Sequence, residues 1–360
     1  MATSMSILAL GAESAGNFSV FKNGKIYLSK DYGDLLNDKN FQKFKTDILN
    51  YLKKNKIKPK IILTDLHPFY KTTDWGKELA KKFKVKHIQI QHHLAHIFSV
   101  YGEKTMIENC KLKIENFIGI ACDGTGYGLD GKIWGGEIFK IKMQKSKCKI
   151  IERIGHLENQ TMLGGELAIR EPARMVISIL SKLLPKEKVY PFIKKFYTKN
   201  EFEILHNQLK QNFNCQETSS TGRILDAVSV LLGFAKNQRK YKHEPIDSLE
   251  KNSTLPYRDI KPKVTGYELL TTPLFEYLIK NLSKDKKRLA ATSQIYIAQG
   301  LYKIIKKSPI TYFAGGIANN KIISAYLQSK GIFVSQKVPR GDAGISFGQI
   351  VYYISTNSRD

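Results

Sequence analysis

The chain has 360 residues, of which 42% are hydrophobic and 11% aromatic, so it is long and apolar enough to bury a core in two lobes. No apolar run reaches the roughly 18 residues of a membrane span, which argues against a membrane protein. The four cysteines are widely spaced and form no CxxC pair, which argues against a zinc ribbon and a disulfide framework. No basic secretory region opens the chain, so a cytoplasmic location is expected. The net charge of +26 raises nucleic-acid binding as a hypothesis, but lysine supplies most of it in dispersed runs, which favours a solvated surface.

The first ninety residues alternate between strand and helix patterns. Short apolar runs bounded by Gly or Asn predict strands, and apolar residues three and four apart predict helices. The expected elements are three strands within 7–30, a helix at 40–54, a strand at 61–63, a helix near 73–83 and a strand at 85–90. This alternation predicts an α/β layer structure.

The next predicted helix, in QHHLAH, carries three of the chain's eight histidines. His92 and His96 are four residues apart and project from one helix face, whereas His93 is turned about 100° away. The pair can give two ligands to one metal ion, but no glutamate lies between them, so the metalloprotease pattern HExxH is absent. Without further ligands, the alternative is a surface helix with solvated histidines.

Residues 117–139 repeat the pattern of the N-terminus: an apolar strand, a Gly-rich turn and two further strands. Gly124 and Thr125 of the predicted turn would approach a phosphate while Asp123 binds a cation beside it, although a plain hairpin is the alternative. Two such starts predict an α/β, bilobal fold of the actin-like ATPase superfamily, with two related lobes around a nucleotide cleft. The lobes are 1–115, with the histidine helix, and 116–360, with the nucleotide-binding loops and a helical insertion.

Residues 166–235 are expected to be mostly helical, and 236–270 irregular. Glu166, at the start of the helical part, is a candidate acceptor for ribose hydroxyls. Arg170 and Arg174 are four residues apart and are candidates to meet an acyl-phosphate or carboxamide oxygen. A surface pair with neighbouring acids is the alternative for these two arginines.

The C-terminal part predicts a helix near 286–306, a strand at 310–314 and a turn that opens another helix. Gly315 and Gly316 in this turn, with Asn320 on the first helical turn, suit contact with a nucleotide, or form an ordinary strand-to-helix turn. Asp342 lies in a later Gly-rich turn. Together with Asp123 it would complete a site of two histidines and two carboxylates, a set that suits iron(II) or zinc.

These stretches resemble, in order, the C-terminal carbamoyltransferase domain of the hydrogenase maturation factor HypF. The resemblance rests on QHHLAH, DGTGYG followed by IWGGE, LGGELAIREPARM, TGRILDAV, GGIANN and GDAGISFGQ, and it covers nearly the whole chain. TsaD, a threonylcarbamoyl transferase that modifies tRNA, shares the HxxxH pair and the GG-x-A-x-N turn but lacks the DGTGYG…WGGE and GGELAIREP blocks.

The resemblance implies transfer of a carbamoyl group from carbamoyl-adenylate to the C-terminal cysteine of HypE, on the way to the cyanide ligands of [NiFe]-hydrogenase. It implies His92, His96, Asp123 and Asp342 as ligands of a divalent metal, iron or zinc, and the ATP/AMP moiety of carbamoyl-adenylate as bound nucleotide, with Mg²⁺ as a further cofactor to consider. A HypE-like acceptor is the expected partner. The alternative is a tRNA-modifying threonylcarbamoyl transferase-like protein or a nucleic-acid binder, which only the charge and the kinship with TsaD favour.

Three departures from the family pattern are present. The acylphosphatase, zinc-finger and adenylate-forming domains are absent from these residues, which implies a separate or excised adenylate-forming domain. The first loop has Ala15 in the segment where the family usually has a lysine. Residues 242–246 read KHEPI in place of EGQAA.

Overall fold

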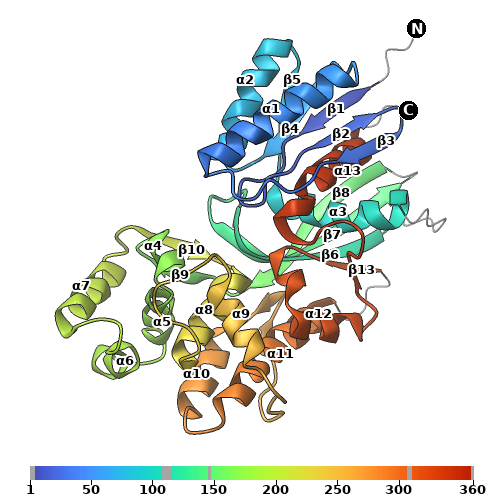
Figure 1. Cartoon of the computed structure of the whole chain (residues 1–360). Helices are drawn as coiled ribbons and strands as arrows, with labels where there is room; N and C mark the ends of the chain where they lie inside the picture. The colour runs from blue at the N-terminus through green and yellow to red at the C-terminus, as the bar shows by residue number, and fades with distance from the viewer. Residues whose placement is uncertain (1–4, 108–115, 145–146, 306–309, 358–360) are drawn as a thin grey trace.

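The computed structural model describes residues 5–107, 116–144, 147–305 and 310–357. Its N-terminal sheet has the strand order β3-β2-β1-β4-β5, with β1–β3 antiparallel and β1, β4 and β5 parallel (Figure 1). Helices α1 (Asp38–Lys54) and α2 (Lys71–Phe83) supply the apolar side chains that cover one face. The strands are β1 (Ser6–Ala9), β2 (Ser19–Lys22), β3 (Lys25–Leu28), β4 (Ile61–Asp65) and β5 (Lys86–Ile90).

The second sheet repeats this topology. Its central order is β8-β7-β6-β13-β14. Strands β6, β7 and β8 are antiparallel neighbours, and β13 and β14 continue the sheet in parallel from β6. These strands are β6 (Asn116–Tyr127), β7 (Ile133–Gln144), β8 (Lys147–Leu157), β13 (Thr311–Ala314) and β14 (Phe333–Val334). Four short strands extend it: β9 (Gln160–Leu163), β10 (Cys215–Thr218), β11 (Val264–Thr265) and β12 (Glu268–Leu269). The predicted bilobal actin-like α/β fold with two related lobes is confirmed.

Two helices lie between the sheets, α3 (His92–Gly102) and α13 (Ile345–Asn357) (Figure 1). Helix α3 packs on β6 and β13 of the second sheet, and α13 packs on α3 and on β1 and β2 of the first. A π-helical segment, η1 (Glu103–Ile107), continues α3. The predicted lobe boundary at 115/116 borders residues 108–115, which lie outside the described ones, and stays a proposal.

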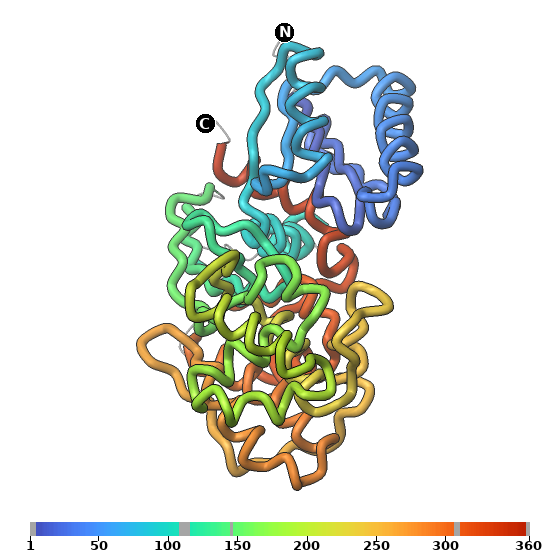
Figure 2. The backbone as a smooth tube through the Cα atoms, turned by 90° about the vertical axis from the view of Figure 1, so that its left-hand side faces the viewer, coloured from blue at the N-terminus to red at the C-terminus, as the bar shows by residue number. Residues whose placement is uncertain are grey.

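Helices α4 to α11 gather at the end opposite the first sheet, in green to orange in Figure 2. Helices α5, α8 and α11 contribute to the largest apolar core, on the other face of the second sheet. No helix in the described part of the chain combines the length and the apolarity of a membrane span. The elements are α4 (Leu167–Arg170), α5 (Ala173–Leu180), α6 (Lys186–Ile193), α7 (Lys199–Lys210), α8 (Thr221–Leu232), α9 (Glu244–Lys251), α10 (Thr272–Lys280), α11 (Lys286–Ile305), η2 (Gly316–Asn319), α12 (Lys321–Gln328) and η3 (Gly341–Gly344).

Two local predictions are wrong. Asp123–Gly126 is not a turn: β6 continues through an irregularity between Cys122 and Gly126, and Gly126 and Tyr127 still pair with β7. The partner strand overrides the local turn preference of DGTG. Residues 236–270 are not wholly irregular, because α9 and the β11–β12 pair lie there; Pro245 occupies the first turn of α9, where a proline is compatible with a helix.

Candidate metal centre

Helix α3 presents two of the candidate ligands and is buried along its whole length. The side-chain oxygen of Gln91 caps its start by accepting a hydrogen bond from the Leu94 N–H (3.0 Å). Helix α13 crosses so closely that a Cβ atom on Gly348 would lie 1.9 Å from the carbonyl oxygen of Ala95. Because it is packed on both sides, α3 is a rigid support for its histidines.

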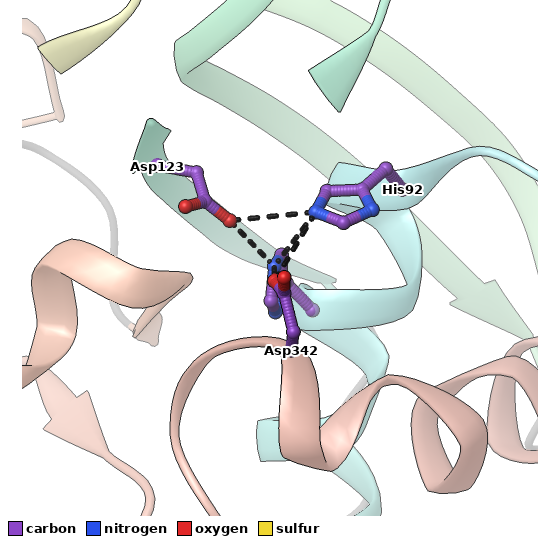
Figure 3. A group of neighbouring side chains, drawn as sticks. His92, Asp123 and Asp342 are labelled. Carbon is purple, nitrogen blue, oxygen red and sulfur yellow. Dashed lines mark hydrogen bonds and ion pairs between the residues drawn. The ribbon is translucent and has the colours of Figure 1, made fainter. Parts of the chain in front are cut away.

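His92 and His96 of α3, Asp123 of β6 and Asp342 of η3 converge, and one ligand atom from each lies within 4.8 Å of all the others. His96 Nε2 lies 2.8 Å from Asp123 Oδ2 and 3.2 Å from His92 Nε2. Asp342 Oδ1 is 3.6 Å from His92 Nε2 and 3.5 Å from His96 Nε2. Figure 3 shows Asp123 and Asp342 directed towards His92 from two other segments of the chain.

These separations fit a common cation. Two ligand atoms each about 2.1 Å from an ion are about 3.0 Å apart at a right angle and about 3.4 Å apart at a tetrahedral angle. The separation of His92 Nε2 from Asp123 Oδ2 is 3.4 Å. Two imidazoles and two carboxylates gathered within 4.8 Å form a donor set that suits a divalent transition metal.

Asp65, at the end of β4, orients His92. Its Oδ2 lies 2.7 Å from His92 Nδ1, and both side chains are at most 2% exposed. Asp65 Oδ1 accepts a hydrogen bond from the His67 N–H (2.9 Å). The carboxylate therefore keeps the proton of a neutral His92 on Nδ1 and leaves the Nε2 lone pair for a metal, as carboxylate–histidine pairs do in metal sites.

The charges in this centre are strongly coupled. Burial lowers the pKa of His92, but Asp65, Asp123 and Asp342 together raise it well above its ordinary value. The pKa of His96 is raised in the same way despite burial. Burial raises the pKa values of Asp123 and Asp342, but opposite charges and hydrogen bonds leave both lowered. A divalent cation that replaces one proton on each histidine leaves the formal charge of the centre unchanged.

Oδ2 of Asp342, the oxygen on the side away from the histidines, has two partners that sequence spacing did not reveal. Ser14 Oγ, from the loop after β1, donates to Asp342 Oδ2. Lys242 Nζ lies 3.5 Å from the same oxygen, and its side chain is 57% exposed. Both belong to segments that depart from the family pattern, the first loop and KHEPI. The departures therefore lie beside the candidate metal centre.

The predicted nucleotide turn packs tightly against β6. A Cβ atom on Gly315, whose φ is +93°, would lie 2.2 Å from the Cys122 carbonyl oxygen, and one on Gly316 would lie 2.9 Å from Asp123 Oδ1. Asn320 uses its side chain internally: Oδ1 accepts from the Ile323 N–H and Nδ2 donates to Gln294. Both glycines are therefore needed for close packing, and nucleotide contact by these three residues stays a prediction.

Gly124 and Thr125 lie in the irregular part of β6. The Gly124 N–H donates to Asp123 Oδ1 (2.6 Å). A Cβ atom on Gly124 would lie 2.9 Å from Nη2 of Arg223, a buried side chain in α8. Burial lowers the pKa of Arg223 to about 10, and Asp226 pairs with it at 3.1 Å. Sequence reasoning had not selected this cation, although TGRILDAV contains it.

Among the described residues, no hydrogen bond or ion pair joins Glu166, Arg170 or Arg174 to the group of four ligands. Glu166 and Arg170 are exposed, and Glu166 is near enough to His67 to act on its charge. Arg174 Nε donates to Glu171 at 2.7 Å. Substrate contact by the three stays a prediction.

His93 faces away from the centre, as its helical position predicts. Gln91 Nε2 lies 3.0 Å from His93 Nδ1 and also donates to the Tyr127 carbonyl. The His93 ring is 6.1 Å from the Trp134 ring, and burial lowers its pKa well below the ordinary value. His93 thus connects QHHLAH to IWGGE and does not take part in the metal group.

Comparison with known proteins identifies the family of this chain. Residues 2–103 match the model of the HypF Kae1-like domain, and residues 119–349 match "Carbamoyltransferase, Kae1-like Domain, second subdomain". The probable carbamoyltransferase HypF of Methanocaldococcus jannaschii is 38% identical over 98% of this chain. A carbamoyltransferase HypF homolog of Cupriavidus necator is 26% identical over 95% of this chain and 90% of its own length.

Solved structures give the same result. T. kodakarensis HypF has a TM-score of 0.85 at 30% identity over 98% of this chain and 48% of its own. Full-length HypF in a phosphate- and nucleotide-bound form has a TM-score of 0.83 at 27% identity, over 98% of this chain and 56% of its own. The chain spans 46% of the M. jannaschii relative. It belongs to the HypF carbamoyltransferase family and corresponds to the Kae1-like domain of that family.

Proposed function

We propose that this chain transfers a carbamoyl group from carbamoyl-adenylate to the C-terminal cysteine thiol of a HypE-like protein, in the synthesis of the cyanide ligands of [NiFe]-hydrogenase. Family membership supports the reaction class. The observation that carries the proposal is the group of His92, His96, Asp123 and Asp342, whose ligand atoms from three separate segments lie within 4.8 Å of one another. A divalent metal, iron or zinc, fits this set.

When bound, the metal would supply Lewis-acid stabilisation of charge on the carbamoyl or phosphate oxygens. His92 and His96 would hold it from a fixed helix, with His92 oriented by Asp65. Lys242 and Ser14 contact Oδ2 of Asp342, and in this proposal they would also meet an anionic leaving group that approaches the centre. Mg²⁺ is a further cofactor that the nucleotide could bring.

The nucleotide would lie between the two lobes, 1–115 and 116–360. Gly124 and Thr125 would contact its α-phosphate, with the buried cation of Arg223 beside Gly124 as an additional charge. The adenosine contacts in this proposal are Gly315, Gly316, Asn320 and Glu166. Arg170 and Arg174 would meet a carbonyl or phosphate oxygen once substrate is bound.

In the transfer step, the acceptor sulfur forms a C–S bond with the carbamoyl carbon while the C–O bond to the phosphate breaks. AMP leaves with the electron pair of that bond, and the thiol proton is released. No cysteine of the described chain is needed as a nucleophile, because the acceptor brings the thiol. Cys122 is fully buried, and burial raises its pKa to about 12, so it is a poor nucleophile.

The donor is made by a separate or excised carbamoyl-adenylate-forming domain. We therefore expect this chain with ATP and carbamoyl phosphate to leave a HypE-like acceptor unmodified, whereas added carbamoyl-adenylate supports transfer. Mass spectrometry of the acceptor measures a gain of one carbamoyl group, and an acceptor with its terminal cysteine replaced by alanine is the control. Efficient transfer from carbamoyl phosphate and ATP by this chain alone would contradict the two-component proposal.

The +26 charge keeps a second candidate, binding of tRNA, open to test. If the lysines form a phosphate-binding surface, tRNA should bind tightly, with a log–log salt slope of about −0.7 to −0.9 per phosphate contact. If they are solvated, the HypE-like protein should bind in preference at about 150 mM salt, which screens charges beyond roughly 8 Å. Saturable tRNA binding without acceptor binding would favour the second candidate.

A further inference from the structure

Glu103 is a fully buried carboxylate at the end of the histidine helix, outside the group of candidate ligands. It has four donors, all from one loop that precedes Asp342. Glu103 Oε1 accepts from the Gln336 N–H (2.8 Å), and Oε2 accepts from the Lys337 (2.9 Å) and Val338 (2.6 Å) N–H groups. The Ser335 hydroxyl donates to the same Oε2.

These contacts form an anion nest built from successive backbone N–H groups. Burial alone raises the pKa of Glu103, but the Ser335 hydroxyl and the three N–H groups lower it below the ordinary value. The carboxylate is therefore ionised at neutral pH, when its hydrogen bonds are charge-assisted and strong. Removing these donors would leave a buried charge without hydrogen bonds, which costs free energy, so the contacts hold the loop firmly.

The loop beyond the nest leads directly to the metal group. Arg340 also holds this loop in place: its Nε donates to the Ser335 carbonyl (2.8 Å) and its Nη1 to the Ala318 carbonyl (3.0 Å). Asp342 follows two residues later and α13 begins at Ile345. The chain between the nest and α13 therefore has little freedom to move Asp342.

Helix α3 connects Glu103 to the histidines, so the helix, the loop that Glu103 binds and Asp342 form a closed chain of contacts. Glu103 is seven residues from His96, which corresponds to about 10 Å along the helix. One end of α3 thus carries the histidines, and the other end holds the loop that returns to them with Asp342. The separation between Asp342 Oδ1 and the histidines, 3.5 and 3.6 Å, depends on both ends.

We propose that Glu103 is a positioning residue that sets Asp342 against the two histidines and thereby determines how tightly the centre binds a divalent cation. The inference rests on the proposed function, because it assumes that the four residues bind a metal. It differs from a purely structural role, since the loss of Glu103 should weaken cation binding by molecules that are still folded.

Glu158 is a matched control elsewhere in the molecule. It is also a largely buried carboxylate that accepts from two backbone N–H groups, Thr271 (2.8 Å) and Thr272 (2.7 Å), and from the Thr272 hydroxyl (2.6 Å). Those groups start α10, far along the chain from the metal group. Glu158→Gln and Glu103→Gln should both lower the melting temperature, and only the latter should change cation binding.

The experiment measures the dissociation constants of Zn²⁺ and of Co²⁺ by chelator competition with the full chain, and records the Co²⁺ absorption spectrum. Glu103→Gln should weaken binding about tenfold and change the spectrum, because the loop that carries Asp342 would lose the charge-assisted hydrogen bonds that hold it. Glu158→Gln should stay within about twofold of the wild type. Ser335→Ala keeps the carboxylate and its N–H donors, and should weaken binding in the same direction by about threefold.

A folded Glu103→Gln protein with the affinity and spectrum of the Glu158→Gln control overturns the inference and leaves the proposed function in place. If Glu103→Gln does not fold, Ser335→Ala decides in the same way. A wild-type chain that binds neither ion overturns the metal centre and the inference together.

Discussion

Replacing Asp65 with asparagine tests whether the centre depends on the orientation of His92. The bond from His92 Nδ1 to Asp65 Oδ2 is 2.7 Å long and nearly inaccessible to water. The asparagine side chain would keep the shape of the aspartate and lose its charge. A hydrogen bond to a charged partner contributes about 1.5–3 kcal/mol, which corresponds to a loss of about 10- to 100-fold in metal affinity. The fold itself should persist, since asparagine can still accept from the His67 N–H.

The assay is a competition titration with Zn²⁺ at about pH 8, where protons compete less with the metal. Asp74→Asn is the control, because Asp74 is an exposed residue of α2 and forms an ion pair with Lys77 (3.2 Å) on the surface of that helix. The control should bind as the wild type does. Asp65→Asn affinity within about twofold of the control, in protein with an unchanged unfolding transition, would refute the role given to Asp65.

Other perturbations give equally direct outcomes. His96→Ala should lose its bound metal and the transfer activity by elemental analysis and acceptor mass spectrometry, whereas His93→Ala should keep most of its metal; equal metal content in the two would count against the ligand set. Metal affinity should increase with pH, by up to about two log units per pH unit below the raised pKa values of His92 and His96, because the cation displaces their protons. The same raised pKa values stabilise the folded metal-free chain at pH values below the unfolded histidine pKa of about 6.5, and this stabilisation is lost as the pH rises through the folded pKa values. Denaturant titrations of metal-free protein should therefore show a free energy of unfolding that falls towards alkaline pH. A rise there would contradict the assignment. Gly348→Ala should destabilise the chain by about 3 kcal/mol or more, because its Cβ atom would lie 1.9 Å from the Ala95 carbonyl oxygen. Gly24→Ala, whose Cβ atom would meet no atom within 4 Å, should cost about 1–2 kcal/mol, from the strain of its φ of +76° alone. A loss at Gly348 no larger than the loss at Gly24 would mean that α3 and α13 can separate.

Much of the candidate centre was predictable from spacing. A pair of histidines four residues apart shares a helix face, and aspartates in Gly-rich segments that follow apolar runs are candidates for further ligands. His92, His96, Asp123 and Asp342 were found in this way, and the structure brings their ligand atoms together. The repeated strand-turn-strand start likewise predicted two related sheets, which the two strand orders confirm.

The residues that support the centre were not predictable in this way, because their partners are distant in sequence. Asp65 reaches a histidine 27 positions away, and Glu103 holds N–H groups more than 230 positions away. Arg223 meets Gly124 only because α8 packs against β6. No local pattern marks a carboxylate or a guanidinium whose partner is chosen by packing.

The sequence by itself determined the kind of elements, the repeated topology and the types of ligand, because these follow from periodicity and from residue chemistry over short distances. Tertiary structure alone decided that DGTG continues a strand, since its pairing with β7 outweighs the local preference for a turn. It also decided that α3 lies between both sheets and that Asp342 returns to it through the Glu103 nest. Contacts between residues far apart in sequence depend on how whole layers pack. The free energy of that packing is shared by many side chains, so no single segment of the sequence reveals it.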